Sequence, residues 1–457
     1  MLRLSWTQPE DLVPHALVAA ELDGRNVDGI RSRWLDAGGP GQAAVSGATP
    51  EPAPTDVRAL ARQLLAELDT VPDSDQLTER EPDGFDAILA AAGESQIPAS
   101  VPSLGSDFPD RVHGAWLGRA AGCLLGKPVE KIPREGIEKI ARATGNWPVT
   151  GYFTEVGLDA DIAEAYPWNR RSRPTSLAEN IDGMPEDDDL NFPLLALDLL
   201  ERIGPTFNTD DVAQSWLGNL PGGRVFTAER ITYRNLLDGY EPDVAGAVQN
   251  PFRDWIGAQI RTDVYGWAAP GDARRAARMA WTDARLSHGR SGVYGALFVA
   301  AASSAAVVAT SIDEVLDAGL SVVPASSRYA EAIRRGREIG RSNLGTSGAL
   351  DAIYTDFGHL HWVHALNNSA LLAFALTRSG GDFQTAVTLA VTGGWDTDST
   401  GATAGAICGA LTGASALPGQ WIEPLHNRLA SSMPGFDNSR FDDLARRTVA
   451  VAEKGRS

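Results

Sequence analysis

The sequence predicts an all-α protein. Apolar residues recur at helical spacing in one segment after another of the 457-residue chain, and no convincing set of alternating strands interrupts them. Two stretches, 110–130 and 393–411, are rich in glycine and other small residues, which is typical of helices that pack closely together. We therefore expect a compact bundle of many helices.

Composition divides the chain into two parts. Residues 1–105 combine helical patterns with two segments rich in Gly, Ala, Pro and Ser, 38–54 and 94–107, which are typical of linkers. From residue 106 onward the helical patterns become denser. We predict an N-terminal helical extension over 1–105, without visible chemistry, and one larger domain over 106–457 that holds the acidic motifs.

The helical patterns follow one another with few gaps, and helical punctuation marks their ends. They cover 11–22, 28–35, 56–68, 85–92, 110–127, 192–202, 209–217, 227–237, 273–287, 312–320, 328–339, 361–377, 383–391, 422–429 and 441–452. The uncharged stretch 292–310 is the nearest approach to a membrane span. Because it is rich in Ala, poor in Leu and carries two serines, a buried central helix is favoured over a transmembrane one.

Charge and cysteine content limit the partners and the compartment. The chain has 40 basic and 59 acidic residues, a net charge of −19, and no long basic run, which argues against binding a nucleic-acid backbone. Two cysteines, Cys123 and Cys408, are too few for a disulfide framework or a Cys-rich zinc site. Acids and a proline interrupt the first 22 residues, so no signal peptide is indicated. We expect a soluble, cytoplasmic protein that binds no membrane.

The most informative stretch is the acidic turn at 393–399. Gly393 and Gly394 allow the backbone to turn, and Asp396 and Asp398 then stand at the start of a small-residue helix. Carboxylates that converge on one point repel each other unless a cation lies between them, and oxygen ligands favour Mg²⁺ or Ca²⁺. An EF-hand loop is excluded because Ile407 stands where a bidentate Glu is needed. An aspartyl-phosphate phosphatase and a plain helix cap stay open as alternatives.

A second acidic run, Glu186 to Asp189, opens the predicted helix at 192–202. Helix N-termini favour negative charge, so capping is one interpretation. Four adjacent acids exceed what capping uses, and a metal site is the other interpretation. Pairing this run with Asp396 and Asp398 favours the metal.

The segment 110–130 predicts a helix with glycines at 114, 118, 122 and 126, which align on one face and allow a neighbouring helix to approach closely. Pro128 ends this helix, and Glu130 follows it. Among the histidines, His288 lies at a helix junction, and His359, His361 and His364 cluster. A three-histidine zinc site is conceivable there, but structural histidines are favoured.

Three stretches of the sequence, taken in order, resemble the motifs of one enzyme family. Gly114 to Glu130 is similar to an opening helix with the motif Gly-Asp-Ala-Leu-Gly-x-x-x-Glu. Asp187-Asp188-Asp189 falls where members of that family have Thr-Asp-Asp. Gly394-Trp395-Asp396-Thr397-Asp398-Ser399 is similar to Gly-Gly-Asp-Thr-Asp-Thr/Ser. Together they resemble the ADP-ribosylglycohydrolase family, which includes the dinitrogenase reductase-activating glycohydrolases, over about residues 110–450.

The resemblance implies an all-α catalytic domain with two Mg²⁺ ions in a cleft, Mn²⁺ being an alternative ion. It implies six metal ligands: Asp187, Asp188, Asp189, Asp396, Asp398 and Ser399. It also implies catalytic roles for Glu130, Asp188 and Asp189, with Glu130 a mobile acid near the scissile bond. We add His288, Trp395 and Gly394 as candidate contacts to the substrate.

Two departures from the family pattern bear on the substrate. Cys123 stands where the family has Asp, so that an outer hydrogen bond is lost. The acidic run reads Glu-Asp-Asp-Asp, which leaves its register open by one residue; we align Asp187 with the family's Thr because Phe192 then falls on an apolar position.

The expected reaction is hydrolysis of the glycosidic bond at ribose C1 of an ADP-ribosyl conjugate, protein-linked or small, with release of ADP-ribose. Positive charge develops on the sugar as this bond breaks, and carboxylates stabilise it and manage the proton. Two alternatives stay open: an N-ribosidase for a small ribosylated metabolite, and a catalytically silent binding or structural relative. The oligomeric state is not predicted.

Overall fold

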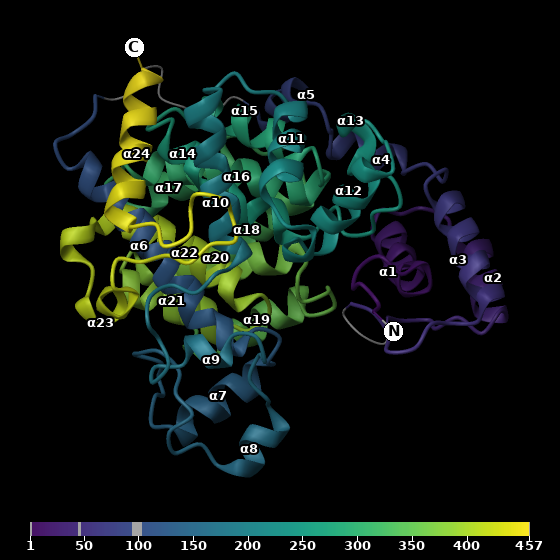
Figure 1. Cartoon of the computed structure of the whole chain (residues 1–457), viewed down its shortest axis with the longest axis horizontal. Coiled ribbons are helices and arrows are strands. Elements are labelled where there is room, and N and C mark those ends of the chain that lie inside the picture. The colour runs from purple at the N-terminus through teal and green to yellow at the C-terminus, as the bar shows by residue number, and fades with distance from the viewer. Residues whose placement is uncertain (1, 44–46, 94–102, 457) are drawn as a thin grey trace.

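The computed structural model describes residues 2–43, 47–93 and 103–456. Within these ranges the chain is helical and has no strand, only three isolated bridges such as that between Met184 and Leu429. The predicted all-α class is confirmed. Figure 1 shows a broad helical body, with α7 and α8 projecting from one side and α1 to α3 standing on one flank.

Two antiparallel helices form the centre of the body: α6 (Phe108–Gly126) and α22 (Thr397–Thr412). Their glycines face one another at very short range. A Cβ added to Gly118 would lie 2.1 Å from the carbonyl oxygen of Gly405, and one added to Gly122 would lie 2.0 Å from that of Gly401. This is the close approach that the glycine spacing predicts, and it brings the C-terminal end of α6 to the N-terminal end of α22.

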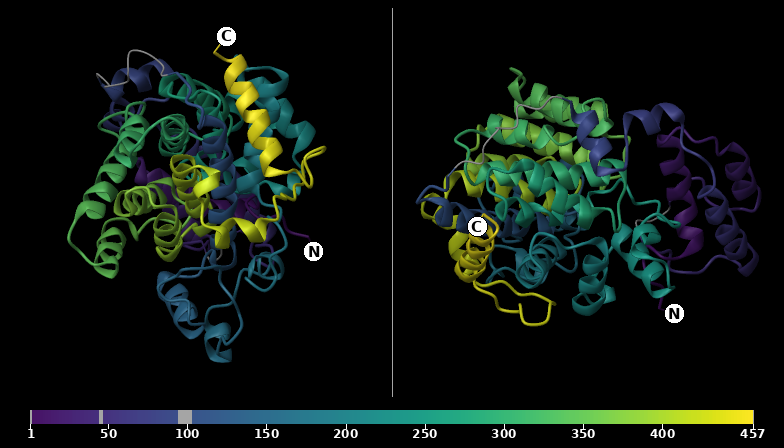
Figure 2. Two further views of the ribbon diagram at one scale, coloured as in Figure 1. Left: turned by 90° about the vertical axis from the view of Figure 1, so that its left-hand side faces the viewer. Right: turned by 90° about the horizontal axis from the view of Figure 1, so that it is seen from above.

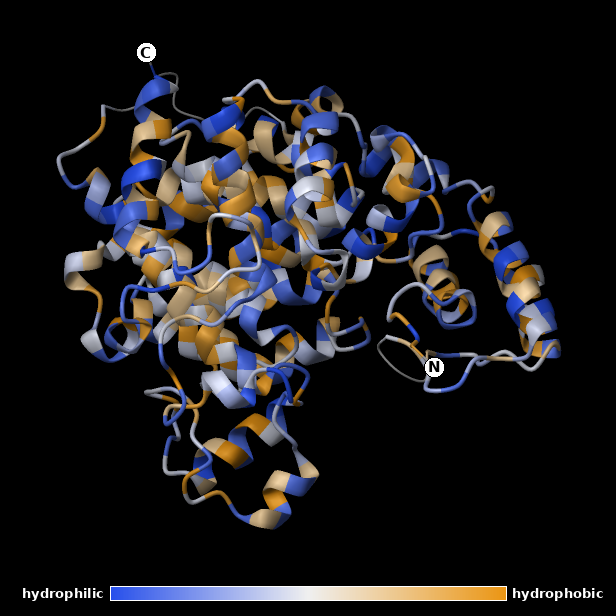
Figure 3. Ribbon diagram, in the orientation of Figure 1, coloured by the Kyte–Doolittle hydropathy of each residue, from blue (hydrophilic) through white to orange (hydrophobic). Residues whose placement is uncertain are grey.

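Other helices surround this pair and complete the core, whose apolar interior is visible in Figure 3. They are α10 (Asp188–Arg202), α14 (Asp263–Trp267), α16 (Arg290–Ala306), α20 (Ala365–Ser379), α21 (Phe383–Thr392) and α24 (Phe441–Lys454). Nearly every residue of α16 is buried, as predicted for the uncharged stretch that it contains. Among the described residues, no helix has the length and apolar character needed to cross a membrane.

The outer part of the body consists of shorter or amphipathic helices. They are α7 (Arg134–Ala143), α8 (Ala160–Ala165), α9 (Arg173–Ser176), α11 (Thr209–Asn219), α12 (Thr227–Leu237), α13 (Pro242–Ala245), α15 (Ala273–Ala284), α17 (Ile312–Leu320), α18 (Arg328–Arg341), α19 (Thr346–Phe357) and α23 (Gly419–Ile422). Single 3₁₀ segments link them: η1 (Lys127–Val129), η2 (Gly222–Arg224), η3 (Ile256–Arg261), η4 (Ala414–Ala416) and η5 (Glu423–Leu425).

The N-terminal extension contains α1 (Pro9–Leu22), α2 (Asp28–Asp36), α3 (Thr55–Leu68), α4 (Asp75–Arg80) and α5 (Phe85–Ala92). Figure 2 shows α1, α2 and α3 grouped on the flank of the body. Parts of the predicted linkers, 44–46 and 94–102, lie outside the described residues. The boundary between 105 and 106 stays a prediction.

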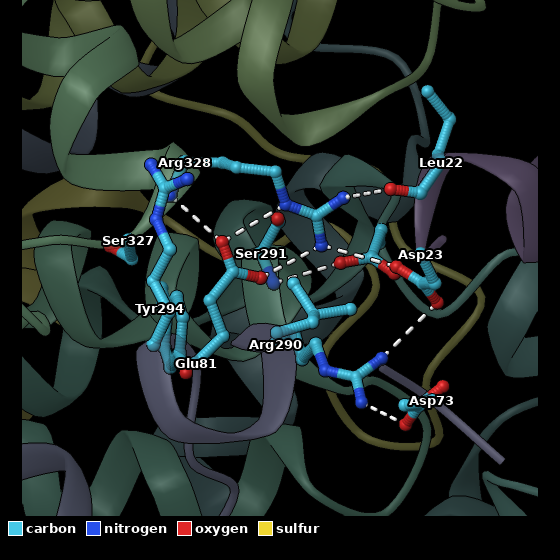
Figure 4. A network of polar contacts seen from close by, with 12 residues as sticks. Leu22, Asp23, Asp73, Glu81, Arg290, Ser291, Tyr294, Ser327 and Arg328 are labelled. Atoms are coloured by element: carbon cyan, nitrogen blue, oxygen red, sulfur yellow. Dashed lines mark hydrogen bonds and ion pairs between the residues drawn. The ribbon is translucent and has the colours of Figure 1, made fainter. Parts of the chain in front are cut away.

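A buried ionic network fastens the extension to the body (Figure 4). The backbone N–H and the Nε of Arg328 donate to Oε1 of Glu81 at 2.8 and 2.9 Å, and its Nη2 donates to Oε2 at 2.8 Å. Asp23 accepts from Arg328 and from Arg290, each at 3.1 Å. Arg290 also pairs with Asp73. Because each charge has a partner of opposite sign, these side chains can stay buried at the joint.

Local structure differs from the sequence prediction at several places, and helices such as α7 and α19 were not predicted at all. The helix predicted over 422–429 is wrong: α23 and η5 are short, and Leu429 forms bridges to Met184 and Ser439. The helix predicted from 361 begins at Ala365, because His364 acts as its N-cap and accepts from the N–H of Leu366 at 3.2 Å. Helix α10 begins four residues earlier than predicted, since Asp187 caps it.

Candidate functional site

The site lies where the N-termini of α10 and α22 meet the turn after α6. Asp187 is the N-cap of α10 and Asp396 is the N-cap of α22, so both helices direct their N–H groups toward the acidic side chains. A helix N-terminus favours negative charge by its dipole. The hydroxyl of Thr397 donates to the carbonyl of Gly126 at 2.8 Å, which joins the α6 turn to the start of α22.

The turn that leads into Asp396 adopts an unusual backbone. Gly394 has φ of 82° and Trp395 has φ of 64°, in the left-handed region that glycine tolerates and tryptophan rarely enters. Stacking on Tyr354, with ring centroids 4.4 Å apart, holds Trp395 in this conformation. The N–H of Asp396 donates to Oδ1 of Asn368 at 3.2 Å. These contacts set the direction of the Asp396 carboxylate.

Three oxygens from the two acidic stretches converge. The hydroxyl of Ser399 lies 2.9 Å from Oδ1 of Asp396 and 3.3 Å from Oδ2 of Asp189. Asp189 is held from behind by Arg119, which donates to its backbone carbonyl at 2.7 Å and lies 3.3 Å from Oδ1. Arg119 in turn pairs with buried Asp263 at 2.7 Å.

Asp187 differs from Asp188 and Asp189 because it forms an ion pair with a lysine. Its Oδ1 accepts from the N–H of Asp189 at 2.9 Å, and its Oδ2 forms an ion pair with the buried Lys127 ammonium. Burial opposes ionisation of this carboxyl, but Lys127 holds its pKa below the usual range. Among the described residues, Cys123, Asp187 and Asp189 are the one group of His, Cys, Asp or Glu side chains with three ligand atoms within 4.8 Å of one another.

Electrostatics indicate that the remaining carboxylates need a cation. Burial first, and then neighbouring carboxylates, raise the pKa values of Asp188, Asp189 and Asp396 well above their usual range. Burial, with Glu130 and Asp187 nearby, raises the pKa of Asp398 to about 7. Closely spaced carboxylates that ionise unfavourably without a cation are typical ligands of a hard divalent ion. Asp189, Asp396 and Ser399, whose oxygens meet at the Ser399 hydroxyl, together with Asp398, which lines the same cavity, are the residues that could hold Mg²⁺.

Glu130 stands at the edge of this group. Its Oε2 accepts from Nδ2 of Asn169 at 2.6 Å, and Nζ of Lys131 lies 3.3 Å from its Oε1. Lys131 also lies over the ring of Trp362, 5.0 Å from the centroid. These partners hold the Glu130 carboxylate at the cavity wall.

A cavity of about 480 Å³ opens above these side chains, within the size range of small-molecule sites. Its lining includes the acidic group with Ser399 (Glu130, Asp187, Asp188, Asp189, Asp396, Asp398), the basic residues Lys131, Arg170, Arg171, Arg224 and Arg230, and the aromatic residues Phe226 and Trp362. Ser5 and Trp6 of the extension also line it. The backbone carbonyl of Ser5 accepts from Arg230 at 3.1 Å.

Three predicted substrate contacts do not line this cavity. His288 is buried, with Nδ1 2.7 Å from Oγ of Ser287 and Nε2 3.9 Å from Oε1 of Glu229. Glu229 lines the cavity, so His288 lies behind its wall. Trp395 and Gly394 support the Asp396 turn instead, where a Cβ on Gly394 would lie 2.8 Å from the Tyr354 hydroxyl.

The histidine cluster also lies apart from the acidic group. His361 and His364 each accept from a backbone N–H two residues on, at 3.3 and 3.2 Å. The three clustered histidines do not converge on one point in the described part of the chain.

Several site residues were missed by the sequence analysis. Arg119 precedes Cys123 by one helical turn, a spacing that places it on the same face of α6 and could have drawn attention to it. Lys127, Asn169, Ser5 and Trp6 carried no comparable signal, because their partners are distant in sequence.

Buried carboxylates from two helix N-termini, gathered in one cavity of an all-α body, define an acid-lined site suited to hydrolysis. The model of the ADP-ribosylglycohydrolase family matches residues 104–457, so the chain belongs to this family. Membership supports a glycohydrolase-type enzyme. A protein of Archaeoglobus fulgidus described only as uncharacterized is 28% identical over 326 residues, which are 70% of this chain and 92% of that protein. A solved "ADP-ribosylglycohydrolase-related protein complex" is 20% identical, covering 77% of this chain and all of its own, with a TM-score of 0.47.

Proposed function

We propose that this protein is a Mg²⁺-dependent hydrolase that cleaves the glycosidic bond at ribose C1 of an ADP-ribosyl conjugate and releases ADP-ribose. The observation that carries the proposal is the convergence of Asp189, Asp396 and Ser399, from two helix N-termini, beneath a cavity that also contains Glu130. Membership in the family supports the reaction class.

The acidic and the basic residues that line the cavity suit different parts of such a substrate. The acidic residues suit the sugar hydroxyls, because a divalent ion bound there would orient them and lower the pKa of a water molecule. The guanidinium groups of Arg170, Arg171, Arg224 and Arg230 suit a diphosphate. The ring of Phe226 lies near two of these arginines, with its centroid 5.5 Å from the guanidinium carbon of Arg171 and 5.3 Å from that of Arg230.

In the reaction, water adds to C1, the bond to the leaving group breaks, and the leaving group takes a proton. Positive charge develops on the sugar, and the carboxylates of Asp188 and Asp189 stabilise it. Glu130 holds or delivers the proton, positioned by Asn169 and Lys131. The conjugate can be an ADP-ribosylated protein or a ribosylated small molecule.

The test is release of ADP-ribose from arginine-, serine- and O-acetyl-linked ADP-ribose, with Mg²⁺ and with a chelator. The variant Asp396→Ala/Asp398→Ala should lose release, whereas Asp161→Ala, at an exposed acid of α8, should keep it. Release that persists in the chelator would contradict the metal's role. No release with metal binding intact would favour an N-ribosidase for a small metabolite, and neither release nor metal binding would favour the silent relative.

A further inference from the structure

The acidic centre contains two sets of donors that share Asp189. One set is Asp189, Asp396 and Ser399: the Ser399 hydroxyl lies 2.9 Å from Oδ1 of Asp396 and 3.3 Å from Oδ2 of Asp189. The other is Cys123, Asp187 and Asp189, with ligand atoms within 4.8 Å of one another. Each of these two groups of ligand atoms could hold one cation.

Lys127 supplies the positive charge at the second set. Its ammonium forms an ion pair with Oδ2 of Asp187 and lies 3.4 Å from the carbonyl oxygen of Glu186. The side chain is buried, with 6% of the residue's surface exposed. Both carboxylate oxygens of Asp187 are therefore engaged, one by Lys127 and the other by the N–H of Asp189.

The backbone at Lys127 is anchored beside the acidic centre. It follows Gly126, where an added Cβ would lie 2.2 Å from the carbonyl oxygen of Thr397, and the Thr397 hydroxyl bonds back to Gly126. The residue is thus fixed against the N-terminus of α22. Its ammonium is covalently attached and therefore does not dissociate from the protein as a bound ion does.

The donors of this set also suit a lysine better than a hard divalent ion. Cys123 contributes a buried sulfur in place of an oxygen, and Mg²⁺ prefers oxygen ligands. An ammonium needs only hydrogen-bond acceptors, which Asp187 and the Glu186 carbonyl provide.

We propose that the Lys127 ammonium is a built-in cation at the Cys123–Asp187–Asp189 set, and that this protein binds one divalent ion where its sequence resemblance implies two. That ion binds at Asp189, Asp396, Asp398 and Ser399. The inference rests on the proposed function because it assumes that the centre binds a metal at all. It assigns Lys127 a positioning role: its charge holds Asp187, and through it the N-terminus of α10.

The first test is the number of Mn²⁺ ions bound per chain, by isothermal titration calorimetry and by electron paramagnetic resonance of free Mn²⁺. The full-length wild-type protein should bind one ion, and Asp396→Asn should bind none. A wild-type stoichiometry of two, with ADP-ribose hydrolysis intact, would overturn this inference and leave the proposed function standing. A stoichiometry of zero without hydrolysis would overturn both.

The second test removes the ammonium group of Lys127. Lys127→Met removes the ammonium at similar length, and Lys127→Met/Cys123→Asp adds a carboxylate to the vacated set; folding is checked by circular dichroism. Lys127→Met/Cys123→Asp should bind two Mn²⁺ ions, whereas Lys127→Met, which keeps the sulfur ligand, and Cys123→Asp, which keeps the ammonium, should each still bind one. A folded Lys127→Met/Cys123→Asp variant that binds a single ion would show that Lys127 does not exclude the second.

A third readout locates the additional ion. Cd²⁺ added to Lys127→Met should produce an ultraviolet thiolate-to-metal charge-transfer band, because Cys123 becomes a ligand. The band should be absent in the wild type and in Lys127→Met/Cys123→Ser, which keeps the second buried cysteine, Cys408, as an internal control. A band of equal strength in the wild type would contradict the occupation of this set by Lys127.

Discussion

Glu130 shows how a single side chain is prepared for proton transfer. It follows η1 at the end of α6, and its carboxylate is held by Asn169 at 2.6 Å and faced by Lys131 at 3.3 Å. Both partners come from outside the metal ligands, so Glu130 can be altered without removing an ion.

We predict that Glu130→Gln lowers kcat by about 10²- to 10⁴-fold, the usual contribution of a general acid or base, and still binds Mg²⁺. Steady-state hydrolysis and calorimetry measure the two quantities. The matched control is Glu135→Gln, since Glu135 is an exposed residue of α7 that pairs with Lys139. A kcat within twofold of wild type in Glu130→Gln would remove Glu130 from the chemistry.

At the scale of elements, the contact between α6 and α22 determines how the two parts of the site are positioned. Glycines at 114, 118 and 122 meet glycines at 409, 405 and 401, so that backbone packs on backbone without side chains between. This packing sets the separation between Lys127 and the Asp396 turn. The glycine spacing predicted that α6 would have a close neighbour; it did not identify α22 as that neighbour.

Gly118→Ala should lower the free energy of unfolding by about 3 kcal/mol or more, because the new Cβ would lie 2.1 Å from the Gly405 carbonyl and the helices must separate. Urea denaturation measures the change. Gly218→Ala is the control: Gly218 is an exposed residue of α11 with nothing within 4 Å of an added Cβ, and the substitution should stabilise by about 0.5–1 kcal/mol. Equal effects of the two substitutions would contradict tight packing at α6.

At the scale of the whole molecule, the N-terminal extension is part of the structure that forms the site. Ser5 and Trp6 line the cavity, Arg230 holds the Ser5 carbonyl, and Trp6 packs against Phe252 and Trp255. Residues 1–103, nearly all of the extension, lie outside the residues that match the family. Its position depends on the buried ion pairs of Figure 4 and on the aromatic contacts of α1.

Glu81→Gln should lower the free energy of unfolding by about 2 kcal/mol, because it neutralises the buried carboxylate that accepts from Arg328 and leaves that guanidinium with Asp23 as its remaining counter-charge. Asp86→Asn also removes an acid of the extension that pairs with an arginine of the body, but its side chain is 88% exposed, and it should cost less than about 0.5 kcal/mol. Urea denaturation of the two variants provides the comparison. Similar losses in both would show that the buried pair does not anchor the extension.

The aromatic contact of α1 predicts a pH dependence. Burial lowers the pKa of His15 from 6.5 to about 4, and burial together with His15 lowers that of His361 to about 3. The unfolded chain therefore takes up protons before the folded one as the pH falls below 6.5, and the free energy of unfolding decreases between pH 6.5 and 4. His15→Phe should reduce this decrease by about 2 kcal/mol.

Denaturation midpoints at pH 7 and pH 4.5 measure this effect. His426→Asn, at an exposed histidine in the left-handed conformation that Asn tolerates, is the control and should leave the pH dependence unchanged. An undiminished pH dependence in His15→Phe would mean that other groups account for it.

Local sequence determined the helices and the chemistry available to the site. Helical spacing of apolar residues, the glycine repeat and the acids at 187–189 and 396–398 depend on residues a few positions apart, and short-range physics decides them. The order of the three motifs was sufficient to indicate the family, and the family match confirms it.

Tertiary structure alone decided which distant residues meet. The pairing of Lys127 with Asp187, the entry of Ser5 and Trp6 into the cavity wall, and the position of His288 behind Glu229 all depend on how helices pack. No periodicity encodes these contacts, because the partners lie tens to hundreds of residues apart and their separation is set by the complementary surfaces of whole helices. The sequence therefore determined which groups this protein could use, and packing determined which of them reach the site.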